Sequence, residues 1–325
     1  MILSNDNYKY IMDIFDKRRM EDEYDLNRRK KEIYEKIPKI QEIDNFIVEK
    51  NVEKAKSLIL GDKSKVPDLD LEVKEAKDEK ITLLISNGFS KDYMEIKYVC
   101  PICKDTGYIG SEKCICFKNE INKLLYKDSN LAEVLKTDNF DSFNLNYYSD
   151  KLQEGEKISP RKRAEDAFLK AKRYVSDFEE NHGNLLICGS PGTGKTFLTH
   201  CIAKEIIDKM NVVFYKSSWE LFDIIRINSF GNSLEKRNNP YDMIFEADLL
   251  IIDDLGSEAN NSLTIPELFT VVNERLLSKK ATIISTNFMP TGLRKTYLDR
   301  IFSRLSNEYD FIYLVGDDIR EKIKK

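Results

Sequence analysis

The carboxy-terminal half of the chain alternates two kinds of hydrophobic pattern. Residues 164–178 and 197–210 have apolar positions at the three- and four-residue spacing of amphipathic helices. Short runs of apolar and β-branched residues, typical of buried strands, lie at 184–188, 212–215, 249–252, 282–285 and 311–315. This alternation predicts an α/β domain with a parallel sheet and helices on both faces.

The first 95 residues follow a different pattern. Between Asp22 and Lys50 apolar residues recur mostly every three or four positions, which predicts helix interrupted at Pro38. Residues 1–80 contain 18 Lys and Arg and 20 Asp and Glu, so nearly half of them are charged. Two interpretations stay open: a solvated helical hairpin or short coiled coil, and a helical arm that binds a partner protein.

These differences divide the 325 residues into four predicted regions. They are a charged helical region (1–95), a cysteine-containing module (96–130), a linker (131–160) and the α/β domain (161–325). The linker carries apolar residues that we expect to pin it to the domain that follows, namely Phe140, Phe143, Leu145 and Tyr147.

Composition narrows the class of protein. The net charge is −4 and 41% of the residues are hydrophobic, which excludes a strongly basic coat protein and a wholly disordered chain. The start shows no basic segment followed by an apolar one, and no apolar run approaches the about 20 residues that span a bilayer. We therefore expect a cytoplasmic protein that has no membrane partner.

A phosphate-binding sequence lies between the first predicted strand and helix of the α/β domain. Residues 189–196 fit G-x-x-x-x-G-K-[ST] in full. The glycines let backbone N–H groups face a phosphate, and the helix N-terminus adds positive potential. Lys195 is expected to reach the β- and γ-phosphates of ATP, and the Thr196 hydroxyl to bind Mg²⁺. The predicted nucleotide-binding residues are Gly189, Ser190, Pro191, Gly192, Thr193, Gly194, Lys195 and Thr196.

Two later strands end in polar residues that suit the same site. The strand at 249–252 leads directly into Asp253 and Asp254, and the strand at 282–285 leads to Asn287. Because parallel strands deliver their carboxyl ends to one edge of the sheet, these side chains should meet the phosphates. Asp253 is the expected Mg²⁺ partner and Asp254 the group that orients or deprotonates the attacking water, with Glu258 as the alternative. Asn287 is expected to bind the γ-phosphate or that water.

Four cysteines are grouped within 17 residues of the second region. Cys100 and Cys103 are separated by two residues, and Cys114 and Cys116 by one. Four thiolates in a reducing compartment suit a structural, tetrahedral Zn²⁺. A redox pair and reduced packing cysteines are the alternatives.

Several arginines follow the last polar strand end. Arg294, Arg300 and Arg304 lie in one stretch, and Arg320 lies near residue 325. A guanidinium can stabilise charge on a transferring phosphoryl group, and an arginine at the edge of one subunit can complete a neighbour's site. For any one of them, a surface ion pair is the simpler interpretation.

Taken together, these motifs resemble the AAA+ ATPases of the DnaC/DnaI helicase-loader type and their relatives, the IstB transposition ATPases. The resemblance covers residues 160–325 and includes the cysteine module as found in DnaI-like members. It rests on the segments 189–196, 250–256, 272–275, 284–287, 299–305 and 316–320.

The resemblance implies roles for single residues and for the whole protein. Arg300 resembles the arginine finger, with Arg304 as its neighbour, and Arg320 takes the place of a sensor 2 arginine. It implies a self-associating ATPase with ATP, Mg²⁺ and Zn²⁺ as cofactors, whose partners are the replicative DNA helicase and single-stranded DNA. Residues 217–247 are the implied DNA-facing region, with Arg226, Lys236 and Arg237 as candidate contacts. The three-residue spacing of Trp219 and Phe222 favours packing against the sheet.

Two departures from the family pattern qualify this hypothesis. Few residues follow the last strand, so a helical lid is expected to be reduced or absent. Many such ATPases have Glu where Asp254 stands, which favours slow, DNA-stimulated hydrolysis acting as a switch. The alternatives are an IstB-like transposition ATPase that binds duplex DNA, and a nucleotide-gated DNA-binding scaffold with little hydrolysis.

Overall fold

A computed structural model of the chain describes residues 5–60, 64–126, 131–153, 155, 157–181, 183–232, 236, 240–257 and 264–323. Its contacts divide the chain into two compact units, Met12–Ile109 and Met1–Ile11 with Gly110–Lys325, and each unit is described by itself. The division into four regions that the sequence predicts is not tested by these two units and stays a prediction. Within the described residues, no helix has the length and apolar content needed to cross a membrane.

The unit Met12–Ile109 is helical. It contains most of α1 (Asn5–Lys36), then α2 (Pro38–Ile59), α3 (Val66–Ser86) and the short strand β1 (Tyr108–Ile109). Its core includes Ile33, Ile37, Ile40, Leu84 and Met94. The predicted interruption is confirmed: α1 ends before Ile37, whose φ of −135° lies outside the helical region that a following proline disfavours, and Pro38 begins α2.

The other unit begins with short elements that lead into the sheet. They are β2 (Glu112–Lys113), α4 (Ile115–Tyr126), α5 (Leu131–Thr137) and the 3₁₀ turns Phe140–Ser142 and Leu145–Tyr147. Asn122 of α4 fixes this helix to the edge of the sheet, because its amide donates to Asn211 O (2.7 Å) and accepts from Val213 N (3.3 Å). In this way α4 satisfies backbone groups that an edge strand would otherwise leave open.

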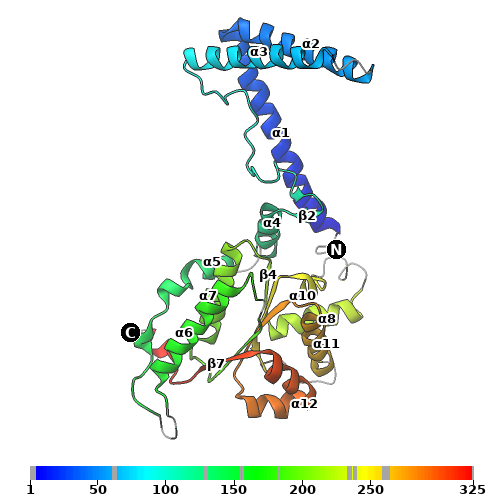
Figure 1. Cartoon of the computed structure of the whole chain (residues 1–325). Coiled ribbons are helices and arrows are strands. Elements are labelled where there is room, and N and C mark those ends of the chain that lie inside the picture. Colours follow the sequence, from blue (N-terminus) through cyan, green and yellow to red (C-terminus); the bar gives the residue numbers. More distant parts are fainter. Residues whose placement is uncertain are drawn as a thin grey trace. The chain divides into compact units, whose positions relative to one another are not determined.

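Five parallel strands form the sheet, in the order β4-β5-β6-β3-β7. The elements are α6 (Pro160–Asp177), β3 (Leu185–Gly189), α7 (Lys195–Asp208), β4 (Val213–Ser217), α8 (Ser218–Phe230), α10 (Met243–Glu246), β5 (Leu249–Leu255), α11 (Thr264–Leu277), β6 (Ala281–Thr286), α12 (Pro290–Glu308), β7 (Asp310–Leu314) and α13 (Arg320–Ile323). Helices α6 and α7 cover one face of the sheet, and α8, α10 and α11 cover the other (Figure 1). The predicted α/β class and all five predicted strands are confirmed.

The core of this unit explains the apolar strand runs. Strands β3 and β6 are buried along their whole length, since helices pack on both of their faces. The linker is part of this core. Phe140 is 5% exposed and belongs to the buried cluster, and the partly buried Phe143, Leu145 and Tyr147 pack against that cluster. The prediction that these residues pin the linker to the domain is therefore confirmed.

Arg275 is the largest fully buried side chain of this core. Its guanidinium donates to the carbonyl oxygens of Ile244 (2.8 Å), Ala247 (3.1 Å) and Ala281, and to the Thr282 hydroxyl (3.0 Å). These groups lie on α10, on β6 and before β5. Burial lowers the pKa of Arg275 to about 10, which leaves it charged at neutral pH. The sequence segment 272–275 thus contains a structural residue that ties α11 to its neighbours.

Replacing Arg275 with Ala should destabilise this unit by about 3–5 kcal/mol, because three buried carbonyl oxygens lose their donors. The free energy of unfolding can be followed by the fluorescence of Trp219, the one tryptophan of the chain, which lies in the same unit. Arg226→Ala removes an exposed arginine paired with Asp223 and should cost under about 1 kcal/mol. Equal losses in the two variants would contradict the role given to Arg275.

Candidate functional site

The phosphate-binding sequence forms the turn between β3 and α7. Gly189 ends the strand, and Lys195 is the first residue of the helix. Gly192 and Gly194 have φ angles of 74° and 92°, the left-handed region that favours glycine. The turn therefore directs the N-terminus of a 14-residue helix toward the space above the sheet edge, which is the geometry that favours a bound anion.

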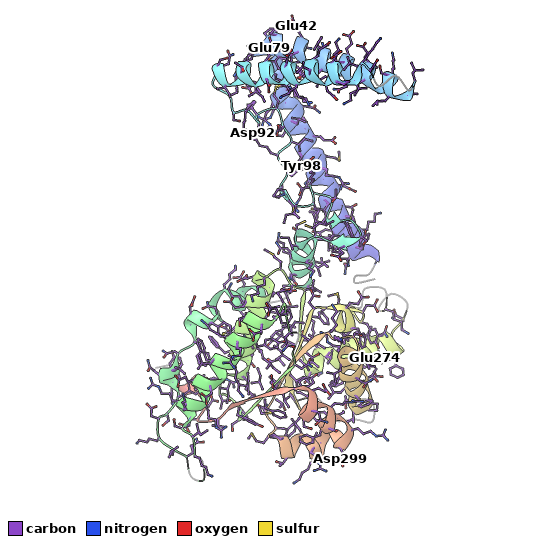
Figure 2. All side chains as sticks on the ribbon, viewed as in Figure 1. Glu42, Glu79, Asp92, Tyr98, Glu274 and Asp299 are labelled. Atoms are coloured by element: carbon purple, nitrogen blue, oxygen red, sulfur yellow. The ribbon has the colours of Figure 1, made fainter. Side chains whose placement is uncertain are left out.

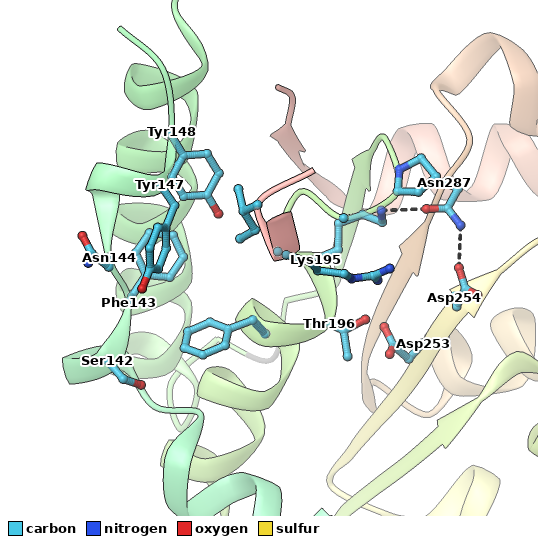
Figure 3. A pocket seen from close by; sticks show the side chains of 16 residues that line it. Ser142, Phe143, Asn144, Tyr147, Tyr148, Lys195, Thr196, Asp253, Asp254 and Asn287 are labelled. Atoms are coloured by element: carbon cyan, nitrogen blue, oxygen red, sulfur yellow. Dashed lines mark hydrogen bonds between the residues drawn. The ribbon is translucent and has the colours of Figure 1, made fainter. Parts of the chain in front are cut away.

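This turn opens onto a cavity of about 520 Å³. Residues from five separate parts of the sequence line it: the linker, the turn with the start of α7, the end of β5, the residue after β6, and the start of α13 with the residue before it. They are Ser142, Phe143, Asn144, Tyr147, Tyr148, Pro191, Gly192, Gly194, Lys195, Thr196, Phe197, Asp253, Asp254, Asn287, Ile319 and Arg320. Figure 3 shows Lys195 and Thr196 facing Asp253, Asp254 and Asn287 across this cavity.

Lys195 is the centre of a hydrogen-bond network. Its ammonium donates to Gly189 O and Ser190 O (both 2.9 Å) and to Asn287 Oδ1 (2.7 Å). Asn287 in turn donates to Asp254 Oδ1 (2.6 Å), as the dashed lines in Figure 3 show. Burial lowers the pKa of Lys195 from its usual value, although the nearby Asp254 and Asp253 carboxylates oppose this effect. Because the acceptors that hold this buried cation are uncharged, an anionic ligand would interact favourably with it.

Asp253 is fixed by residues of the strands on either side of β5. The Ser285 hydroxyl of β6 donates to its carboxylate, and Ser217 of β4 is its register partner. Tyr215 of β4 lies behind it, and burial together with the Asp253 charge raises the pKa of Tyr215 well above the usual value. The Asp253 carboxylate is thus held facing Thr196, the arrangement that a shared Mg²⁺ would need.

A register shift in β5 spans Asp253 and Asp254. The pairing of β5 with β6 changes between Ile252 and Leu255, and Asp254 has a φ of 55°. Such a bulge re-aims a side chain. It lets two consecutive carboxylates face the same cavity, where alternation along a regular strand would turn one of them away.

The linker supplies a wall of the cavity that sequence reasoning missed. We call Phe143, Tyr147 and Tyr148 the aromatic wall. The Phe143 and Tyr148 rings are stacked, with centroids 6.0 Å apart, and the Tyr148 hydroxyl donates to Thr193 O (3.0 Å). Only the apolar residues of the linker signalled this contact, and they predicted packing without indicating that the wall reaches the phosphate turn.

The segment before α13 closes another side. Ile319 N donates to Gly192 O (2.9 Å), and a Cβ atom at Gly192 would come within 2.4 Å of the Asp318 carboxyl group. Arg320, whose N–H is bound by Asp318 Oδ1 (2.9 Å), lines the cavity. The sequence-predicted Arg320 is therefore brought to the same site as Lys195.

The other predicted residues lie elsewhere. Arg300 and Arg304 are exposed on α12 and do not line the cavity, and Arg294 is paired with Asp299 (2.5 Å), which Figure 2 shows at the outer side of this helix. Glu258 and Arg237 lie outside the described residues. The candidate DNA contacts within the described residues are held by neighbouring residues. Arg226 is paired with Asp223 (2.6 Å). Lys236 donates to Ser229 O (3.4 Å).

The expected packing of Trp219 is wrong: this residue lies in the first turn of α8 and is 66% exposed.

The cysteine segment forms a compact turn. Asp105 is fully buried and accepts from Val99 N (2.7 Å) and Cys100 N, while Gly107 N donates to Cys103 Sγ (3.3 Å). Cys114 precedes α4, and Cys116 lies in its first turn. The Sγ atoms of Cys100, Cys103, Cys114 and Cys116 lie within 4.8 Å of one another. Four thiolates at this spacing fit a tetrahedral metal ion.

Comparison with known proteins places the site in a family. The family described as IstB-like ATP binding protein matches residues 161–322. Residues 161–322 are therefore similar to the IstB-like ATP-binding proteins. The resemblance of this domain to the DnaC/DnaI type of AAA+ ATPase is confirmed.

Individual relatives of the IstB-like domain are distant. The replicative helicase loader DnaC of Escherichia coli K12 is 26% identical over 140 residues, which are 43% of this chain and 57% of that protein. The insertion sequence ATP-binding protein y4pL of Sinorhizobium fredii is 25% identical over 168 residues, 50% of this chain and 67% of that protein. The match to the crystal structure of DnaI covers 58% of this chain and 93% of that chain, at 22% identity and a TM-score of 0.44.

The lowered pKa of Lys195 predicts how ATP affinity depends on pH. As pH rises toward this pKa, Lys195 loses its proton earlier than an ordinary lysine, so the positive charge that faces the phosphates disappears. We expect ATP affinity to begin to fall at a lower pH than the titration of an ordinary lysine, at about 10.4, would produce, measured by titration with a fluorescent ATP analogue. Lys195→Arg keeps its charge throughout and should bind more weakly but with a flat profile. A flat profile in the unaltered protein would refute this prediction.

Proposed function

We propose that this protein is an ATP-dependent switch that loads the replicative DNA helicase onto single-stranded DNA. The observation that carries this proposal is the meeting of Lys195, Asp253, Asp254 and Asn287 in one cavity of an IstB-like ATP-binding domain. The helicase loader DnaC of E. coli among its relatives supports the loading role. A cytoplasmic location is part of the same proposal.

The chemistry follows from the positions of the residues. Lys195 exchanges its bond to Asn287 for the β- and γ-phosphates of ATP, and the amides of residues 189–194 cradle the same groups. Thr196 and Asp253 would hold Mg²⁺, which would supply positive charge to the phosphates. Asn287, released from Lys195, and Asp254 orient the attacking water. Arg320, which lines the same cavity, adds a second positive charge for the phosphates.

The aromatic wall and Phe197 bind the base. The wall stands beside the phosphate turn and is joined to it by the bond from Tyr148 to Thr193 O. Flat rings next to a phosphate site suit a purine, because stacking contributes about 1 kcal/mol beyond the area that it buries. A nucleotide in the cavity therefore contacts the linker directly, so its binding can change the position of the linker. This makes the cavity suitable for a switch.

Hydrolysis is proposed to be slow and to need a second subunit. Asp254 accepts a hydrogen bond from Asn287 and is one methylene shorter than the Glu of faster enzymes. Its carboxylate therefore reaches less far toward the attacking water, which slows hydrolysis. Arg300 is exposed on α12 and is proposed to complete the site of a neighbouring subunit, with Arg304 as the competing candidate.

The remaining regions are proposed to bind the partner. Residues 1–95 and the module at 96–130 contact the helicase, and Cys100, Cys103, Cys114 and Cys116 hold a structural Zn²⁺. Helix α2 exposes an apolar row in a heavily charged region, with Val48 63%, Val52 49% and Ile59 85% exposed. Exposed apolar residues rimmed by charges are the usual mark of a protein contact.

The transposition ATPase remains the second candidate. The relative y4pL supports it, and the two functions differ in the DNA that they bind. A preference for duplex over single-stranded DNA, with no binding to a replicative helicase, would favour it. ATP binding without turnover would instead favour a nucleotide-gated scaffold.

Turnover should depend on residues from two subunits. Lys195→Ala and Arg300→Ala should each lose at least about 100-fold in DNA-stimulated ATP hydrolysis. A mixture of the two variants should regain activity, because some sites combine an intact Lys195 with a neighbour's intact Arg300. Arg304→Ala serves as the matched control and should keep its turnover. A mixture that stays inactive, beside an active Arg304→Ala, would reject Arg300 as the finger.

Helicase capture should depend on the apolar row of α2. Val48→Asp with Val52→Asp should weaken capture of the purified replicative helicase at least about 10-fold, because charge at a buried contact is costly. The control is Glu42→Gln with Glu79→Gln, two exposed acids of the same helical pair (Figure 2), which should change capture little. ATP binding should be unchanged in both. Undiminished capture by the first variant would exclude this surface.

A further inference from the structure

A hollow of about 240 Å³ lies between α6 and the edge strand β7, away from the nucleotide cavity. Three cations of α6 line it, Arg163, Lys170 and Arg173, together with the aromatic side chains Phe311 and Tyr313 of β7. We call it the α6–β7 hollow. None of its lining residues also lines the nucleotide cavity.

The aromatic side chains of the hollow form a stacked pair. Phe311 and Tyr313 are two positions apart on β7 and lie half-buried, while the alternate residues Ile312 and Leu314 fill the core. Their ring centroids are 5.9 Å apart with planes inclined by 22°. The Arg163 guanidinium lies 5.9 Å over the Tyr313 ring. This places a flat, partly exposed ring surface beside a cation.

The charge of α6 differs from that of the chain. Six of its 18 residues are basic and three are acidic, in a protein of net charge −4. Arg163, Lys170 and Arg173 share one face, since they are seven and three residues apart, and they span roughly 15 Å of helix. Asp166 is the one acid that lines the hollow, and Lys162 lies 3.6 Å from it. The face beside β7 is therefore positive.

The edge of β7 is obstructed where a partner strand would pair. Lys170 Nζ donates to Phe311 O (3.1 Å), which occupies a carbonyl group that strand addition would use. A row of cations beside stacked rings instead suits single-stranded nucleic acid, whose phosphates pair with the cations and whose unpaired bases stack on the rings. A duplex keeps its bases stacked inside and cannot use the rings.

We propose that the α6–β7 hollow binds a short single-stranded segment of nucleic acid. The phosphodiester groups lie on Arg163, Lys170 and Arg173, and a base stacks on Phe311 and Tyr313. This contact lies at the opposite edge of the sheet from β4 and α8, the region expected to face DNA in the family. It does not rest on the ATP switch, since it uses none of the cavity residues.

Binding of a fluorescein-labelled oligothymidylate to the full chain tests this proposal. Lys170→Gln with Arg173→Gln keeps hydrogen-bonding side chains but removes two charges. It should weaken binding about 10-fold and reduce the slope of log affinity against log salt by about 1.4. Arg161→Gln with Lys204→Gln removes the same charge from positions outside the hollow, where these residues pair with Asp150 and Asp208. It should change affinity less than about twofold.

Crosslinking locates the contact independently. An oligonucleotide carrying 5-iodouracil should crosslink to the peptide that contains Phe311 and Tyr313, and should do so equally in a Lys195→Ala background that lacks the ATP switch. Equal losses in the two glutamine variants would overturn the proposal, as would crosslinks confined to other peptides. So would competition by a poly-glutamate peptide as strong as that of the oligonucleotide, because the hollow would then be an acidic-protein site.

Discussion

A buried ammonium group held by uncharged acceptors is the constraint on which the site depends. Lys195 is held by two carbonyl oxygens and the Asn287 amide, and its lowered pKa reflects the cost of that burial. Phosphates of a bound nucleotide would supply the missing charge. The sheet register and the glycines of the turn place Lys195 beside the ends of β5 and β6, so that one ligand contacts all three.

The same constraint explains why distant parts of the chain meet at this cavity. Tyr148 of the linker and Ile319 before α13 each bond to a carbonyl group of the phosphate turn, at Thr193 and Gly192. A ligand that changes the conformation of the phosphate turn therefore also displaces the bonding partners of both segments. This gives a physical basis for a switch in which nucleotide occupancy biases the linker, without a large lid.

The sequence predicted the parts of the site that have a local signature. The phosphate turn, the buried strands and the interruption at Pro38 follow from residue type and spacing alone. The aromatic wall does not, because the linker is irregular and its contacts with residues 191–196 are long-range. The bulge at Asp254 depends on pairing between β5 and β6. Arg275, within a motif segment of the family, is a buried structural residue, and Trp219 is exposed where three-residue spacing favoured packing.

Helicase loading itself gives the sharpest test of the proposed function. The replicative helicase is added to forked DNA whose single-stranded arm is covered by single-strand-binding protein, and unwinding is measured with and without this protein. The account predicts unwinding that requires this protein and ATP, and that is lost with Lys195→Ala. Unwinding that is equally rapid without this protein, or with Lys195→Ala in its place, would contradict it.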